Sequence, residues 1–248
     1  MKSFVRFVAS LALCNQVLIA QDEPAQRIFV NLTWQVWTRE IRPDGSPRDR
    51  SATVNTPSTG TCWVTEHNGE KIIVTAAHNL GLTVKARPSE VGGKKVREIA
   101  SLTAKPVLGT LAYEVAKVGL LKGRYDVAFI LPADTNAFNG SRVIPLARVP
   151  AKREDKVKIY GFPNTSSPHP TDTTVVDFTL GQDYMKFATP LEPGYSGGVV
   201  LNADGKALGV VIATEAKQST AIVVNAAVLS RVQWRTAREV LTQDFSKP

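Results

Sequence analysis

The feature that most constrains this chain is its succession of short β-rich runs separated by turn residues. The clearest pair covers residues 61–65 and 71–75, and the polar segment His67-Asn68-Gly69-Glu70 lies between them. An Asn-Gly turn between two such runs predicts a β-hairpin. Because similar runs recur along most of the sequence, we expect an all-β protein built of antiparallel barrels or sandwiches.

The β-rich runs fall into two groups. A segment rich in Pro, Asp, Asn and Gly, residues 132–141, separates the two groups, and an exposed loop is expected at residues 42–50. Beyond the last run, apolar residues recur near helical spacing and predict a C-terminal helix over residues 228–244. The runs themselves cover residues 28–37, 61–65, 71–75, 111–118 and 125–131, then 156–160, 173–180, 185–188, 199–201, 207–214 and 221–224.

The first twenty residues have the layout of a secretory signal peptide. Residues 1–6 contain Lys2 and Arg6, and residues 7–20 are mostly apolar and end at the small residue Ala20. We expect cleavage after Ala20 and a secreted or periplasmic protein. No other stretch is long enough to cross a bilayer as a helix.

The remaining chain is expected to hold two domains. The first covers an N-terminal segment and a first barrel, residues 21–135, and the second covers a second barrel and the C-terminal helix, residues 136–248. Loss of Lys2 and Arg6 lowers the formal charge from +8 to +6. The other basic residues are scattered, which favours a solvated surface over a nucleic-acid site. We expect a monomer without a metal or cofactor.

One cysteine remains after the signal peptide is removed. Cys14 leaves with that peptide, so Cys62 has no intramolecular partner. It is interpreted as a small buried apolar residue. The alternative is a reactive or intermolecular thiol.

Three stretches carry residues that nucleophilic catalysis requires. Ser196 lies in the glycine-rich segment Gly194-Tyr195-Ser196-Gly197-Gly198. A serine hydroxyl needs a base and an orienting acid. His78 follows the apolar run at residues 72–74 and Asp126 begins the run at residues 126–131, so these two residues are the candidates.

Other residues of the same types are weaker candidates. His67 and His169 lie in polar or proline-rich segments and are interpreted as surface residues. Asp134 follows Pro132-Ala133 at the end of a predicted strand and lacks an apolar run after it.

With Thr75-Ala76-Ala77-His78, Asp126-Val127-Ala128 and Gly194-Tyr195-Ser196-Gly197-Gly198, the sequence resembles the trypsin/chymotrypsin-like serine peptidases. The resemblance implies two six-stranded antiparallel β-barrels. It also implies a Ser-His-Asp triad of Ser196, His78 and Asp126, which hydrolyses peptide bonds through an acyl-enzyme. The backbone N–H groups of Gly194 and Ser196 would form the oxyanion hole, and protein or peptide substrates would be the partners.

The sequence departs from animal trypsins at two positions. Tyr195 stands where those enzymes have an aspartate that pairs with a new N-terminus, and Asn79 stands where they have a disulfide cysteine. The motif style resembles the glutamyl-endopeptidase and HtrA-type branch, although a PDZ module is not expected after the protease part. Activation by an N-terminal ion pair is therefore not expected.

The same resemblance indicates which residues would line the substrate pocket. No aspartate stands among them to receive Arg or Lys, so small or medium uncharged side chains are expected at the cleavage site. The alternative function is a catalytically inactive binding protein of the same fold. The pocket residues are Thr189, Pro190 and Leu191 together with Ile212, Ala213 and Thr214.

Overall fold

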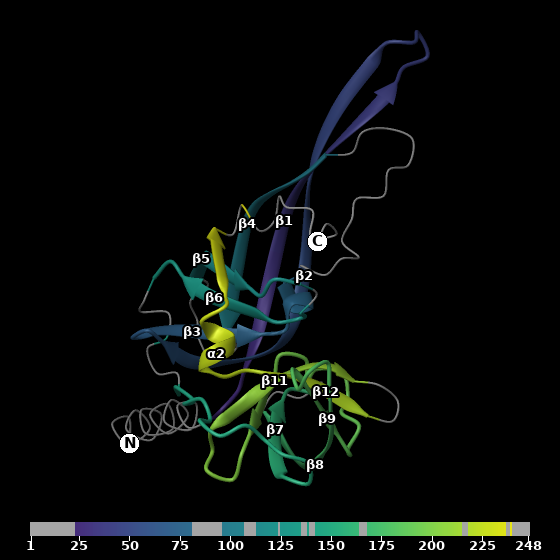
Figure 1. Cartoon of the computed structure of the whole chain (residues 1–248). Coiled ribbons are helices and arrows are strands. Elements are labelled where there is room, and N and C mark those ends of the chain that lie inside the picture. The colour runs from purple at the N-terminus through teal and green to yellow at the C-terminus, as the bar shows by residue number, and fades with distance from the viewer. Residues whose placement is uncertain are drawn as a thin grey trace, which may run out of the picture.

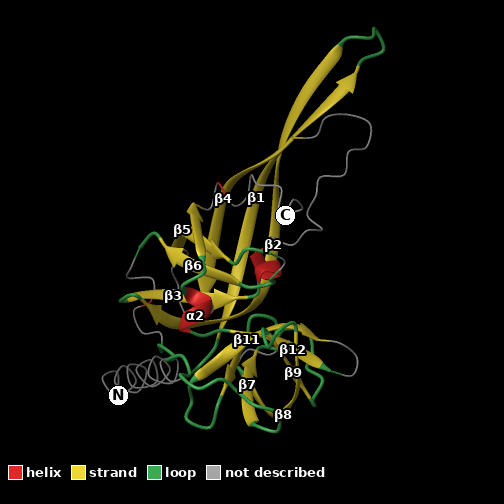
Figure 2. Cartoon of the chain, in the orientation of Figure 1, coloured by secondary structure: helices red, strands yellow, loops and turns green. Residues whose placement is uncertain are grey.

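A computed structural model gives the fold of the chain (Figure 1). It describes residues 23–80, 96–106, 113–123, 125–134, 138, 142–163, 168–214, 218–236 and 239. The described part is mostly β-structure, in two units that lie against one another, and helix is limited to short turns (Figure 2). The expectation of an all-β protein is confirmed, while the proposed signal peptide lies outside the described residues.

The first unit is an antiparallel sheet of seven strands in the order β13-β5-β4-β1-β2-β3-β6, and β5 also pairs with β6. The predicted hairpin at Asn68-Gly69 is confirmed, because β2 and β3 pair from Cys62↔Thr75 to His67↔Glu70. The strands are β1 (Gln26–Ile41), β2 (Pro47–His67), β3 (Glu70–Thr75), β4 (Val96–Pro106), β5 (Tyr113–Leu120), β6 (Ala128–Pro132) and β13 (Gln233–Thr236).

The second unit is a closed antiparallel barrel in the order β10-β11-β12-β9-β8-β7. This confirms the six-stranded barrel predicted for the second half. The strands are β7 (Lys156–Gly161), β8 (His169–Thr179), β9 (Tyr184–Phe187), β10 (Val199–Leu201), β11 (Ala207–Thr214) and β12 (Ser219–Val223).

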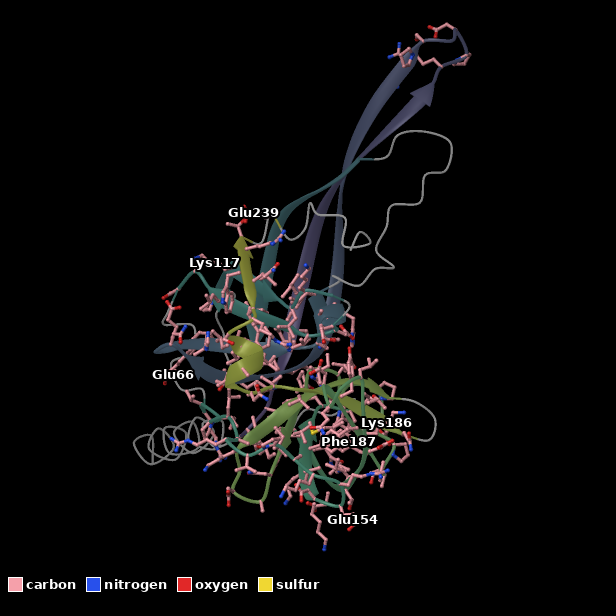
Figure 3. The ribbon with its side chains drawn as sticks, in the orientation of Figure 1. Glu66, Lys117, Glu154, Lys186, Phe187 and Glu239 are labelled. Carbon is pink, nitrogen blue, oxygen red and sulfur yellow. The ribbon has the colours of Figure 1, made fainter. Side chains whose placement is uncertain are left out.

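Three apolar clusters explain why these runs form strands. Alternate side chains of a strand point to opposite faces, so a strand buried on both faces needs a nearly continuous apolar run. In β3, Ile73 packs inside the first unit, whereas Ile72 and Val74 face a core shared by both units. In β9, Phe187 is fully buried in the barrel and its neighbour Lys186 is only half-buried (Figure 3).

The predicted helix over residues 228–244 is wrong for residues 230–236, whereas Val228, Leu229 and Glu239 are helical. The α-helix α2 covers only Ala226–Leu229, and β13 then pairs with β5 through Trp234↔Gly119. The reason is that Val232 and Trp234 both pack against the shared core, which requires the period of two of a strand. Residues 237, 238 and 240–248 lie outside the described part.

β1 and β2 continue beyond the body of the protein as a long hairpin (Figure 1). Their register runs without a shift from Gln26↔Cys62 to Ile41↔Pro47, and the turn is confined to residues 42–46. The loop expected at residues 42–50 is therefore shorter than predicted, because residues 47–50 belong to β2.

Cys62 lies in β2 with its side chain buried in the core of the first unit. Burial raises the pKa of the Cys62 thiol from 9.0 to about 12. A thiol that stays protonated is a poor nucleophile, which agrees with the interpretation as a small apolar residue. No helix in the described part of the chain is long and apolar enough to cross a membrane.

Candidate active site

His78 and Asp126 meet at one end of the β3–β6 pair. Because these strands are antiparallel, with Thr75 opposite Ala128, the end of β3 lies beside the start of β6. His78 sits in a 3₁₀ turn, Ala77–Leu80, directly after β3. Its Nδ1 donates to Asp126 Oδ2 at 2.6 Å, and its backbone N–H donates to Asp126 Oδ1 at 2.8 Å.

This double contact fixes the histidine in one orientation. The carboxylate accepts the Nδ1 proton, so Nε2 of the neutral ring is left as the free acceptor. The side chains of His78 and Asp126 are 33% and 28% exposed, so both remain open to solvent and to a substrate. The sequence-based pairing of these two residues agrees with the geometry.

Ser196 lies in the loop between β9 and β10, and backbone hydrogen bonds hold that loop on the barrel. Gly197 N–H donates to Val211 O at 2.7 Å, and Val211 N–H returns a bond to Gly198 O at 2.9 Å. Gly197 has a φ of +87°, and a Cβ there would lie 1.9 Å from Thr61 O. Only glycine fits this position.

Two buried polar residues of the first unit bind the same loop. Thr61 donates its N–H to Ser196 O at 2.9 Å and its hydroxyl to Gly194 O at 2.7 Å. Asn79 donates its Nδ2 to Ser196 O at 3.0 Å and to Thr75 Oγ1 at 3.0 Å. The nucleophile loop is therefore attached to β2 and to the turn that carries His78.

These contacts were missed by the sequence-based reasoning. Thr61 was assigned only to the β-rich run at residues 61–65, and Asn79 was noted only for replacing a cysteine. The signal in the sequence was a polar residue next to an apolar run. In the structure Thr61 is fully buried and Asn79 is 2% exposed. Buried polar groups need partners, and here the partners are the nucleophile loop itself.

The backbone at Gly194 lies close against the backbone of Phe162. Gly194 has a φ of +107°, and a Cβ there would lie 2.2 Å from Phe162 O. Among the described residues, the N–H groups of Gly194 and Ser196 donate to no protein acceptor. Two free donors on one loop are what an oxyanion hole requires.

The hydroxyl of Ser196 makes no hydrogen bond to His78 or to any other residue of the described part of the chain. The two residues are nevertheless linked through Asn79, which follows His78 and binds Ser196 O. In substrate-free enzymes the catalytic hydrogen bonds are often long and shorten when substrate binds. The arrangement brings Ser196, His78 and Asp126 to the junction of the two units.

Tyr195 anchors the other side of the nucleophile loop. Its ring is 2% exposed and packs on Gly161, where a Cβ would lie 2.5 Å from the ring. Its hydroxyl is 2.6 Å from Thr171 Oγ1 and donates to His169 O at 3.2 Å. Burial raises the pKa of Tyr195, so the phenol stays neutral.

A second contact crosses between the units beside Asp126. Tyr125 donates its hydroxyl to Asp183 Oδ2 at 2.6 Å, and its ring stacks on Tyr184 with centroids 6.0 Å apart. The hydrogen bond to the Asp183 carboxylate raises the pKa of Tyr125. The contact ties the segment before Asp126 to the turn between β8 and β9.

The predicted pocket residues lie on neighbouring strands and loops of the barrel. Thr189 is half-buried and Pro190 exposed in the β9–β10 loop, where Leu191 N–H donates to the buried Ser219 hydroxyl at 2.7 Å. Ile212, Ala213 and Thr214 belong to β11, and Thr214 pairs with Ser219 of β12. Ser219 thus joins the two predicted walls, and sequence reasoning did not select it.

The side chains of the rejected candidates take no part in these contacts, and His169 contributes only its backbone carbonyl to Tyr195. His169 and Asp134 are exposed, and His67 is half-buried at the β2–β3 turn, where its Nε2 is 3.2 Å from Asn68 Nδ2. No group of three His, Cys, Asp or Glu side chains among the described residues is placed to hold a metal ion.

Comparison with known proteins gives a family and a fold. The profile of the trypsin-like peptidase domain matches residues 60–210, more than half of the chain. The crystal structure of the active form of the Rv3671c protease from M. tuberculosis superposes with a TM-score of 0.52, at 18% sequence identity, over 89% of this chain and 86% of that chain. An inactive form of that protease covers 88% of this chain and 92% of its own, at 18% identity and a TM-score of 0.49. No curated protein matches the sequence.

Proposed function

Because the chain belongs to the trypsin-like peptidase family, we propose that it is a serine endopeptidase that cleaves peptide bonds through an acyl-enzyme. The observation that carries the proposal is the His78–Asp126 pair at 2.6 Å, positioned beside a loop that holds Ser196 between free backbone donors. These parts match the chemical roles that acyl transfer needs.

In the proposed reaction, Ser196 Oγ attacks the carbonyl carbon of the scissile bond. His78 Nε2 takes the hydroxyl proton and returns it to the leaving amine, while Asp126 stabilises the imidazolium. The N–H groups of Gly194 and Ser196 receive the negative charge on the carbonyl oxygen, and each such donor contributes roughly 3–4 kcal/mol. Water then attacks the ester carbon with His78 as the base, which releases the acid product and restores Ser196.

The anchor at Tyr195 supports a protease that needs no activation by an ion pair to a newly cut N-terminus. Tyr195 stands at the position where animal trypsins have an aspartate that must pair with a new N-terminus. Its buried phenol instead bonds to Thr171 and His169. The loop is therefore held by contacts that exist in the intact chain. This is the role we assign to Tyr195, and it favours constitutive activity.

For substrate preference, we propose small or medium uncharged side chains before the scissile bond. The support is that the predicted pocket residues Thr189, Pro190, Leu191 and Ile212 are all uncharged. Cleavage profiling on a peptide library tests this, and dominant cutting after Arg, Lys or Glu would rule it out.

We also propose that the protein is exported, because residues 1–20 have the layout of a secretory signal peptide. N-terminal sequencing of secreted material tests cleavage after Ala20.

The function itself is tested by incubating an unfolded protein such as casein with the wild type and with Ser196→Ala. The proposal predicts new peptide termini with the wild type only. Binding of casein by both proteins without cleavage would support the catalytically inactive alternative. Cleavage by both proteins would show that a different residue is the nucleophile.

A further inference from the structure

Asp126 lies in a segment outside the regular strands. Residues 125–127 precede β6 and belong to no helix or strand. Besides its two bonds to His78, Asp126 accepts one backbone bond among the described residues, from Ala77 N–H to its carbonyl oxygen at 3.3 Å. The position of its carboxylate therefore depends on how the neighbouring residues of the chain are anchored.

The two neighbours of Asp126 are anchored in different ways. Val127 is fully buried in the core shared by both units. Tyr125 is half-buried and reaches across to the second unit, where its hydroxyl donates to Asp183 Oδ2 at 2.6 Å and its ring stacks on Tyr184. A hydrogen bond to an ionised acceptor is about twice as strong as one between neutral groups. Tyr125 thus holds one side of Asp126 through a partner in the other unit.

Asp183 ends a turn whose backbone is strained. Leu180, Gly181 and Gln182 join β8 to β9 with φ angles of +51°, +69° and +75°. The left-handed region is unfavourable for the two of them that carry a Cβ, and Leu180 is 73% exposed, so packing of its side chain gives little in return. Strain of this kind persists where surrounding contacts require it, and it gathers at functional sites. Here the turn presents the Asp183 carboxylate to Tyr125.

We propose that Tyr125 and Asp183 form a latch between the two units that positions Asp126 against His78. The inference rests on the proposed function. With the latch closed, the segment that carries Asp126 is held on one side by Tyr125 and on the other by Val127, and the carboxylate stays 2.6 Å from His78 Nδ1. The two residues of the latch act through Asp126 and are positioning residues.

Loss of the latch is expected to slow the chemical step. One end of the short segment is then released, and the Asp126 carboxylate moves relative to the imidazole that it orients. A shift of about 1 Å at a reacting group costs about a hundredfold in rate, so a smaller shift is expected to cost about tenfold. Binding of the substrate does not use this hydrogen bond, so KM should change little.

The first test measures kcat and KM with fluorescently labelled casein. Tyr125→Phe keeps the ring stacked on Tyr184 and removes the hydroxyl, and the proposal predicts a kcat about tenfold lower with KM changed by less than about twofold. Tyr184→Phe is the matched control, because it removes the other hydroxyl of the stack, which donates to no protein acceptor in the described part of the chain. It should match the wild type.

The outcomes of this test separate the two proposals. An unchanged kcat in Tyr125→Phe, or an equal loss in Tyr125→Phe and Tyr184→Phe, would overturn the latch alone. Failure of the wild type to cleave casein would overturn the proposed function instead.

Variants of Asp183 separate the hydrogen bond from the negative charge. Asp183→Ala removes both, whereas Asp183→Asn removes the charge and keeps an acceptor oxygen for Tyr125. We expect a loss of about tenfold in kcat for Asp183→Ala and of less than about threefold for Asp183→Asn. Combining Tyr125→Phe with Asp183→Ala should still cost about tenfold, because both changes break one bond. A loss of about a hundredfold in the double variant, or equal losses in the two Asp183 variants, would contradict the latch.

A spectroscopic readout does not depend on turnover. The proton of a short hydrogen bond such as that from His78 Nδ1 to Asp126 resonates far downfield in the proton NMR spectrum. The latch predicts that this resonance moves upfield and broadens in Tyr125→Phe and stays in place in Tyr184→Phe, at a temperature where circular dichroism shows all the proteins folded. Asp183→Ala gives the same comparison without changing a residue next to Asp126. An unchanged resonance in both latch variants would overturn the proposal whether or not the protein cleaves casein.

Discussion

Gly197→Ala is the substitution whose effect the geometry defines most sharply. Gly197 has a φ of +87°, and an added Cβ would lie 1.9 Å from Thr61 O and 2.5 Å from Thr75 Oγ1. Gly205 is its matched control, with a φ of +72° and no atom within 4 Å of the added carbon. Both substitutions force alanine into the left-handed region, and only one of them displaces the contacts of the nucleophile loop.

The magnitudes separate the two variants. Left-handed alanine costs roughly 1–2 kcal/mol, and the loss of glycine freedom in the unfolded chain offsets about 0.4–1 kcal/mol of this. Gly205→Ala is therefore expected to lose about 1 kcal/mol. Gly197→Ala also disturbs the bonds from Thr61 and Asn79 to Ser196 O, each worth about 0.5–1.5 kcal/mol, so a loss of about 2–4 kcal/mol is expected.

The assay combines urea unfolding with the second-order rate of fluorophosphonate labelling. A shift of about 1 Å in a reacting group costs about a hundredfold in rate, so Gly197→Ala should label at least that much more slowly. Gly205→Ala should label at the wild-type rate. Equal labelling by the two variants, or labelling of Gly197→Ala within a few-fold of the wild type, would refute the role assigned to the close contact between Gly197 and Thr61 O.

Three further predictions concern the surroundings of the site. Asn79→Asp places a carboxylate against Ser196 O, and we expect a loss of about 2–4 kcal/mol in urea unfolding together with slower labelling. Tyr195→Phe removes the hydroxyl bonded to Thr171, and calorimetry should find about 1 kcal/mol less stability with labelling retained within tenfold. Cys62 has its pKa raised by burial, so the folded state keeps a proton that the unfolded state loses. Stability should therefore fall as pH rises from 9 toward 12, by up to about 1.4 kcal/mol per pH unit, and Cys62→Ala should lack this slope. An unchanged slope in Cys62→Ala, wild-type labelling by Asn79→Asp or a labelling loss beyond tenfold in Tyr195→Phe would contradict the respective argument.

The positions of the three candidate catalytic residues could be predicted because local sequence determines where each one stands. His78 follows a strand whose apolar run is unambiguous, and Asp126 begins another, so strand pairing brings them together. Ser196 was marked by glycines that the backbone geometry requires. These signals are short-range, and a single sequence contains them.

The parts that could not be predicted depend on partners distant in the sequence. The sequence spacing of Val228 and Val232 fits one continuous helix, and it fits equally well a helix that ends at Leu229. Only the pairing of Trp234 with Gly119 shows that a strand follows. Thr61 and Asn79 hold the loop of Ser196 through hydrogen bonds to a residue more than a hundred positions away in the sequence. Polar residues 47–59 have little strand propensity of their own, and their register with β1 makes the long hairpin.

The most direct test of the central claim is to locate the fluorophosphonate adduct on the purified protein by peptide mass spectrometry. The account predicts one adduct, on Ser196, that is absent from Ser196→Ala and strongly reduced in His78→Ala. An adduct on another residue, or no adduct on the folded wild type, would contradict the claim that Ser196, His78 and Asp126 act together as a nucleophile, base and acid.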